Sequence, residues 1–154
     1  MLFRSSYWEA ARDHSWWGHP EVEERASCEV YARDSFENLV YAIAMFKRDT
    51  GCLPGKIVFA GWAFKAARLD MHRAAMKWPR QRFVYLGVNN PAAQDVEKAL
   101  AGESAVVKAA ELDPYLLGSD FAAKREARNP FHLRHSYRGI SSELDRLFDI
   151  LDGE

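Results

Sequence analysis

The sequence predicts an α/β fold, a Rossmann-like three-layer domain with a small, mainly parallel sheet. Strand and helix signals alternate without a gap between residues 28 and 78, and a third strand signal follows over residues 82–88. Strands that each follow a helix are typical of a parallel sheet covered by helices. The length of 154 residues suits a single domain, with a core over 28–90 and a C-terminal helical region over 91–154.

The core begins with a predicted strand over residues 28–32, a short run rich in strand formers. Asp34 or Ser35 is expected to cap the helix that follows, because Glu37 stands three residues after Asp34 in capping-box spacing. Gly51 predicts the helix end. The apolar face expected from helical spacing consists of Phe36, Leu39, Val40, Ile43 and Phe46.

The same order then repeats along the chain. Residues 56–61 predict a buried strand, residues 64–77 a helix ended by Pro79, and residues 82–88 a third parallel strand. Outside this core, the expected helices cover residues 2–12, an alanine-rich stretch over 92–110 broken by Gly102, residues 120–127, and a last amphipathic stretch capped by Ser141 or Ser142.

Composition excludes several classes of protein. The formal net charge of −1 lacks the excess of Lys and Arg expected of a general nucleic-acid binder. No apolar run reaches the length of a signal peptide or a membrane span, so we expect a cytoplasmic protein without a membrane partner. Cys28 and Cys52 lack metal-ligand spacing and are interpreted as reduced packing residues. Residues 124–138 nevertheless carry five basic residues and two histidines against one acid, a candidate anion contact.

The candidate site lies where parallel strands end, because ligands of open α/β sheets collect there. Ser35 and Asn38 fall within one turn at a helix start, whose unpaired backbone N–H groups suit an anion or a polar ligand edge. The structural alternative is that Ser35 only caps the helix and Asn38 only fixes a neighbouring loop. Lys65 and Arg68 share a face at the next helix start, where two cations require an anionic ligand or a buried carboxylate such as Glu29.

Complete catalytic signatures are absent from the sequence, which lacks G-x-G-x-x-G, a Walker loop, G-x-S-x-G and H-E-x-x-H. His72 is expected on the surface or in packing. His135, in the basic segment, is a candidate catalytic residue because histidine titrates near neutral pH. Glu29 is a candidate base or charge partner, and Arg128 a candidate ligand-binding residue. No metal site is expected.

Two segments of the sequence resemble a known family. Residues 29–38 read EVYARDSFEN, and a strand ending at Gly61 is followed by FKAAR over 64–68. The pattern is similar to the core of the domain-of-unknown-function family 218, the YdcF, SanA and ElyC-like proteins, whose bacterial members read approximately E-x-x-S-x-N-T-x-E-N, then a strand and H-x-x-R-A. The direct matches are Glu29, Glu37, Asn38 and Arg68; Ser35 and Asp34 are conservative, whereas Ala32 and Lys65 depart.

The departures resemble the fungal branch of that family, which also carries DPY, KR and RNPF segments like those at 113–115, 124–125 and 128–131. The resemblance implies a Rossmann-like domain with a ligand site at the strand ends. It suggests a nucleotide-like ligand such as S-adenosylmethionine for some members and implies no single reaction. Family members usually begin with two further strands, so the chain is expected to be N-terminally truncated relative to them and to lack half of the site.

Two functions compete at this stage. The leading hypothesis is binding of an anionic or nucleotide-like small molecule, with a metabolic reaction that the sequence does not name. The alternative is a non-catalytic interaction or regulatory subunit derived from the same family. RNA binding is the weakest interpretation, because no aromatic-basic motif is present.

A sheet without its first strands would expose an edge that the chain must cover. We therefore predict a homodimer, or an obligate partner, in contact with aromatic residues of the first twenty positions. These residues are Phe3, Tyr7, Trp8, Trp16 and Trp17.

Overall fold

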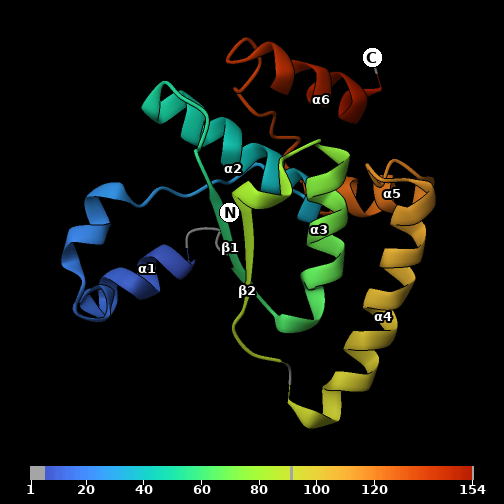
Figure 1. The fold of residues 1–154 in the computed structure, drawn as a ribbon, viewed down its shortest axis with the longest axis horizontal. Coiled ribbons are helices and arrows are strands. Elements are labelled where there is room, and N and C mark those ends of the chain that lie inside the picture. Colours follow the sequence, from blue (N-terminus) through green and yellow to red (C-terminus); the bar gives the residue numbers. More distant parts are fainter. Residues whose placement is uncertain (1–5, 91, 154) are drawn as a thin grey trace.

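The computed structural model describes residues 6–90 and 92–153. Two strands and the helices α2 and α3 form its centre, with α1 and α4 on opposite sides of them in the view of Figure 1. In chain order, the elements are α1 (Ser6–Asp13), η1 (Ser15–Gly18), η2 (Pro20–Arg25), α2 (Ser35–Thr50), β1 (Ile57–Gly61), η3 (Ala63–Lys65), α3 (Ala66–Ala75), η4 (Arg80–Arg82), β2 (Phe83–Gly87), α4 (Ala93–Leu112), α5 (Ser119–Ala127) and α6 (Ser142–Asp152).

The two strands pair in parallel, with Ile57 opposite Phe83 and Gly61 opposite Gly87. The backbone N–H of Val88 donates to the carbonyl of Gly61 across 2.9 Å, so the pairing continues past the strand ends. The α/β class and the parallel pairing are therefore confirmed. Among the described residues the sheet has two strands, however, and the three-layer Rossmann-like arrangement stays a prediction.

The predicted strand over residues 28–32 is wrong. This segment has no sheet partner among the described residues, and its backbone N–H groups are occupied locally. The carboxylate of Glu29 accepts from the backbone N–H of Tyr31 at 2.8 Å and of Ala32 at 2.9 Å. A side chain that bonds its own backbone offers an alternative to a strand ladder, and here that alternative is adopted.

Helix α2 begins and ends as predicted. Asp34 Oδ1 accepts from the backbone N–H of Glu37 at 2.8 Å, and Gly51 adopts the left-handed conformation at φ 78°. The Glu37 carboxylate accepts from the backbone N–H of Arg33 at 2.7 Å. Both ends of the helix are thus closed by hydrogen bonds that the sequence spacing indicates.

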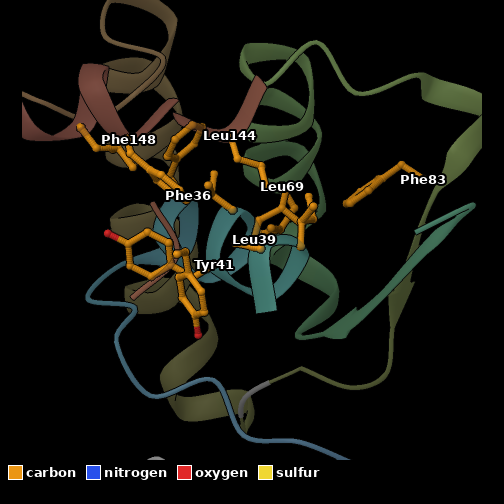
Figure 2. Close-up of a cluster of buried hydrophobic side chains, with 12 residues drawn as sticks. Phe36, Leu39, Tyr41, Leu69, Phe83, Leu144 and Phe148 are labelled. Carbon is orange, nitrogen blue, oxygen red and sulfur yellow. The ribbon is translucent and has the colours of Figure 1, made fainter. Parts of the chain in front are cut away.

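The core forms around α2 (Figure 2). Phe36 and Leu39 of α2 are fully buried, with Leu69 of α3 and Phe83 of β2 to one side of them and Phe148 of α6 to the other. Burial of such side chains contributes roughly 1.5–3 kcal/mol each. This packing fixes the position of α2 relative to α3, β2 and α6.

Helix α4 runs unbroken from Ala93 to Leu112, so the predicted break at Gly102 is wrong. A single glycine inside a helix costs only about 1 kcal/mol, which a 20-residue helix packed against α3 offsets. The strand β1 is also less buried than predicted. Val58 on its outer face is 56% exposed and Leu86 of β2 is 50% exposed, because the helices α2 and α3 cover only the other face.

The N-terminal aromatic residues behave differently from one another. The rings of Trp8 and Trp16 pack edge to face at 5.9 Å, whereas Trp17 is 67% exposed and Tyr7 is 86% exposed. Phe3 lies outside the described residues. Within 6–90 and 92–153, no helix combines the length and the apolar character that crossing a bilayer requires.

Candidate functional site

An open cleft of about 980 Å³ lies where α2 and α3 begin. Its wall comes from the segment before α2, the start of α3, the middle of α4, and α5 with the loop after it. A second hollow of about 310 Å³ is lined mainly by apolar side chains, with Asn90 as its polar residue. We assign the candidate site to the larger cleft, because it gathers charged and polar groups together with apolar ones.

The cleft brings together six of the seven candidate residues. The lining includes Glu29, Ser35, Asn38, Lys65, Arg68 and Arg128. Residues separated by up to about a hundred positions thus share one wall. His135 is the exception and does not line the cleft.

A buried charge network lies directly behind this wall. Asp34 Oδ2 accepts from Arg125 Nη1 at 2.8 Å, with side chains only 10% and 7% exposed. Glu37, fully buried, pairs with Arg33 through several hydrogen bonds, and Glu37 keeps the pKa of that guanidinium above its ordinary value. The network fixes α5 against the start of α2, so the cleft wall does not depend on loop conformation alone.

Ser35 contacts α3 at the base of the cleft. Its Oγ lies 2.9 Å from Nε2 of His72, which is fully buried. Burial lowers the pKa of His72 to about 4, helped by Arg68 and opposed by Asp34, so its imidazole is neutral at neutral pH. His72 is therefore a buried packing residue, which is one of the two positions that the sequence analysis expected.

Two cations occupy the start of α3. Arg68 forms an ion pair with the buried Glu103 of α4, Nε to Oε1 at 3.0 Å. Lys65 makes no ion pair within the described part of the chain, and its ammonium lies 5.7 Å from the centre of the Phe64 ring. Burial and then the charge of Arg68 lower the pKa of Lys65, while Glu103 opposes this. Burial raises the pKa of Glu103, with both cations opposing.

A buried carboxylate, one of the two explanations offered for the cations at the start of α3, does accompany Arg68, but it is Glu103 and not Glu29. Arg68 pairs with Glu103, and Glu29 accepts from two backbone N–H groups and from the hydroxyl of Tyr137 at 3.2 Å. All three donors belong to the protein itself. They also occupy its lone pairs, so Glu29 is better placed to order its own loop than to remove a proton from a ligand.

The far wall is formed by the end of α5. Arg128 Nη1 donates to the carbonyl of Arg33 at 2.7 Å, which joins this wall to the segment before α2. Asn129 closes the next loop, since its amide donates to the carbonyl of Leu133 and its Oδ1 accepts from the N–H of Leu133. This loop presents Phe131, 69% exposed, at the rim. Asn38 is exposed and also lines the cleft.

His135 lies in an aromatic cluster instead. Its ring is 4.5 Å from that of Phe148 and 4.7 Å from that of Tyr41, and its Nδ1 accepts from the backbone N–H of Tyr137. Burial lowers its pKa. The structure therefore separates His135 from the other candidate residues, and its predicted catalytic role loses its geometric basis.

Comparison with known proteins adds one relative. The chain is 27% identical over 119 residues to the uncharacterized protein YOR238W of Saccharomyces cerevisiae. The match covers 71% of this chain and 39% of the yeast protein, so the chain spans well under half of that relative. No family model and no solved structure matches. The resemblance to family 218 thus stays a prediction.

Three residues directly behind the cleft wall were not among the predicted site residues. His72, Glu103 and Arg125 are all buried and each contacts a residue of the cleft wall. His72 stands four positions after Arg68 and so shares its helix face, a local signal that could have placed it beside the site. Arg125 belongs to the basic segment over 124–138 that the sequence marks as a candidate anion contact, whereas Glu103 carries no local signal because its partner is distant in sequence. Within the described residues, no group of three metal-ligating side chains is found.

Proposed function

We propose that this chain binds a small anionic ligand, phosphorylated or nucleotide-like, in the cleft. The observation that carries the proposal is the charge of the wall and of the residues directly behind it. Six basic side chains there accompany four acidic ones, an excess of two positive charges in a chain of net charge −1. The basic ones are Arg33, Lys65, Arg68, Lys124, Arg125 and Arg128; the acidic ones are Glu29, Asp34, Glu37 and Glu103.

Lys65 is the centre of this excess. Its half-buried ammonium forms no ion pair with the described residues and lies beside a second cation, an arrangement that costs free energy until an anion binds. The nearby backbone N–H groups of Ser35 and Phe36 also lack acceptors in the described structure, as expected at a helix start. An anionic group between these elements would satisfy both.

The apolar part of the wall favours a ligand larger than a simple ion. Phe121, Phe131 and Leu116 lie on the wall, and a volume of about 980 Å³ is at the upper end for a drug-sized ligand. An aromatic base or a comparable flat group would contact these side chains while its phosphate or carboxylate reaches Lys65. A nucleotide cofactor such as S-adenosylmethionine enters here only through the family resemblance.

A second candidate function rests on a different surface. Val58, Leu86 and Val88 are 56%, 50% and 67% exposed on the outer face of the strand pair, and Trp62 is 40% exposed beside them. Clustered exposed apolar side chains mark interaction surfaces. This observation favours the alternative of an interaction subunit, in which a second copy of the chain covers the strands.

Calorimetry and thermal shift with AMP, inorganic phosphate and adenosine test the first proposal. We expect AMP to bind and raise the melting temperature, and adenosine to bind more weakly. Lys65→Gln and Arg68→Ala should each weaken AMP binding about tenfold, since a charged hydrogen bond contributes roughly 1.5–3 kcal/mol. Lys56→Gln is the matched control, because Lys56 is exposed at the opposite end of β1. Equal binding by all four proteins, or none by any, would overturn the proposal.

A further inference from the structure

The burial of His72 determines which partner donates the hydrogen bond between Ser35 and His72. Because burial lowers the pKa of His72 to about 4, its imidazole is neutral at neutral pH, and one of the two ring nitrogens carries a hydrogen. Nε2 lies 2.9 Å from Ser35 Oγ, whereas Nδ1 is buried and has no hydrogen-bond partner among residues 6–90 and 92–153. Whichever nitrogen carries the hydrogen, Nδ1 remains unsatisfied.

The two tautomers differ in what they leave unsatisfied. With the hydrogen on Nδ1, a buried N–H donor has no acceptor. With the hydrogen on Nε2, only a lone pair on Nδ1 lacks a donor. Orphaned buried N–H donors are rarer in proteins than under-satisfied acceptors. The geometry therefore favours the tautomer in which Nε2–H donates to Ser35 Oγ.

This assignment determines what the serine hydroxyl can do. Since Oγ accepts from His72, its own hydrogen must point away from the imidazole. Ser35 lines the cleft, and the described structure offers its hydroxyl no other partner. Arg68 lies one helical turn before His72 on the same face of α3, which brings its guanidinium to the same part of the wall.

From this arrangement we infer that Ser35 donates a hydrogen bond to an anionic oxygen of the ligand, a phosphoryl oxygen in particular, and that His72 is the positioning residue that orients it. The inference rests on the proposed function and adds a specificity contact to it. A phosphoryl group offers several acceptor oxygens, so one can meet Ser35 while others meet Lys65 and Arg68. A neutral hydroxyl group of a ligand at the same place would leave the charges of Lys65 and Arg68 unbalanced.

The direction of this hydrogen bond is the opposite of the one that activates a nucleophilic serine. A catalytic base must accept the serine proton, and here the imidazole donates instead. In a triad, a carboxylate bonded to Nδ1 holds the histidine in its accepting tautomer, and no described carboxylate bonds Nδ1 of His72. Ser35 is therefore a binding residue and not a nucleophile.

The test uses the full chain, with AMP and inorganic phosphate as probes at pH 7.5. Ser35→Ala should weaken AMP binding about tenfold, and Ser35→Thr, which keeps the hydroxyl, should retain it. His72→Gln keeps a neutral N–H donor and should bind nearly as well as the wild type. His72→Leu should lose affinity as Ser35→Ala does. Circular dichroism establishes that each variant is folded.

A second measurement needs no ligand. Nitrogen NMR of ¹⁵N-histidine-labelled protein, with His72→Gln for assignment, should show His72 with its hydrogen on Nε2. A hydrogen on Nδ1, labelling of Ser35 by a fluorophosphonate, or equal AMP affinity of Ser35→Ala and wild type would overturn the inference. Failure of the wild type to bind either probe would instead overturn the proposed function, and the NMR result would then decide the tautomer alone.

Discussion

Asp34 Oδ2 accepts a hydrogen bond from Arg125 Nη1 at 2.8 Å, although 91 positions separate the two residues. The other oxygen of the same carboxylate caps α2 by accepting from the N–H of Glu37. One side chain thus begins the central helix and fixes α5, which carries part of the cleft wall. Its position explains how a wall assembled from distant segments keeps a defined shape.

Replacement of Asp34 should be strongly destabilising. Asp34→Ala removes a helix cap, about 1 kcal/mol, and leaves the buried Arg125 unpaired, about 3–5 kcal/mol. Asp34→Asn retains the capping oxygen and should lose about 1 kcal/mol less. Urea denaturation measures both. Asp49→Ala is the control, because the Arg48–Asp49 pair is exposed and should contribute under about 1 kcal/mol. Similar losses in Asp34→Ala and Asp49→Ala would contradict this role.

His72 should make stability depend on pH. Burial, with a smaller contribution from Arg68 and against that of Asp34, lowers its pKa from 6.5 to about 4. Between these values the unfolded chain takes up a proton that the folded chain does not, so stability is lost as pH falls through this window. The full loss is about 3 kcal/mol at roughly 1.36 kcal/mol per pKa unit.

Urea unfolding of wild type and His72→Gln at pH 7 and pH 4.5 isolates this effect, because the other titrating groups are common to both proteins. The wild type should lose about 2 kcal/mol more between the two pH values than the variant does. Parallel losses in the two proteins would show that His72 titrates normally.

Local patterns predicted the helices well and long-range contacts poorly. The capping spacing of Asp34 and Glu37, the end at Gly51 and the order of β1, α3 and β2 are all visible in short windows. The strand over 28–32 failed because the carboxylate of Glu29 satisfies the backbone N–H groups that a neighbouring strand would need. Strand propensity does not register such competition.

In the candidate site, too, local patterns were predicted and long-range contacts were not. Ser35 and Lys65 were found because each stands at a helix start, and the second of these starts follows the end of β1, where ligands collect in α/β folds. The sequence did not predict Glu103 as the partner of Arg68. Several carboxylates of the sequence were possible partners, and only the packing of α4 on α3 selects Glu103. The prediction that His135 belongs to the site was wrong for a similar reason, because its segment turns toward α6 and away from the cleft.

Lys77 offers a stabilising substitution. It has φ 57° at the end of α3, where Trp78 N–H donates to the carbonyl of Arg73 and Lys77 N–H to that of Ala74, the pairing that usually takes glycine. Lys77→Gly should raise the free energy of unfolding by up to about 1 kcal/mol. Gly51→Ala, at φ 78°, should lower it by about as much. Urea denaturation measures both changes. A loss of stability in Lys77→Gly would show that packing of the Lys77 side chain stabilises the fold by more than the strained backbone costs.

The last prediction concerns assembly. Tyr7 and Trp17 remain largely exposed, and the outer strand face carries Val58 and Leu86. Burial of such side chains between two copies would contribute roughly 25 cal/mol per Å² of apolar surface. We therefore expect sedimentation analysis to show a dimer at micromolar concentrations.

Two variants identify which surface makes that contact. Trp17→Ser should weaken the dimer if the N-terminal aromatic residues meet across the two-fold axis, as the sequence predicts. Leu86→Lys should do so if the strand faces meet instead, because it places an ammonium on the apolar face. Both side chains are exposed in the single chain, so neither variant should change the unfolding midpoint of a monomer by much. A wild type that sediments as a monomer throughout would show that the chain tolerates its open strand face in water, and the dimer prediction would then be wrong.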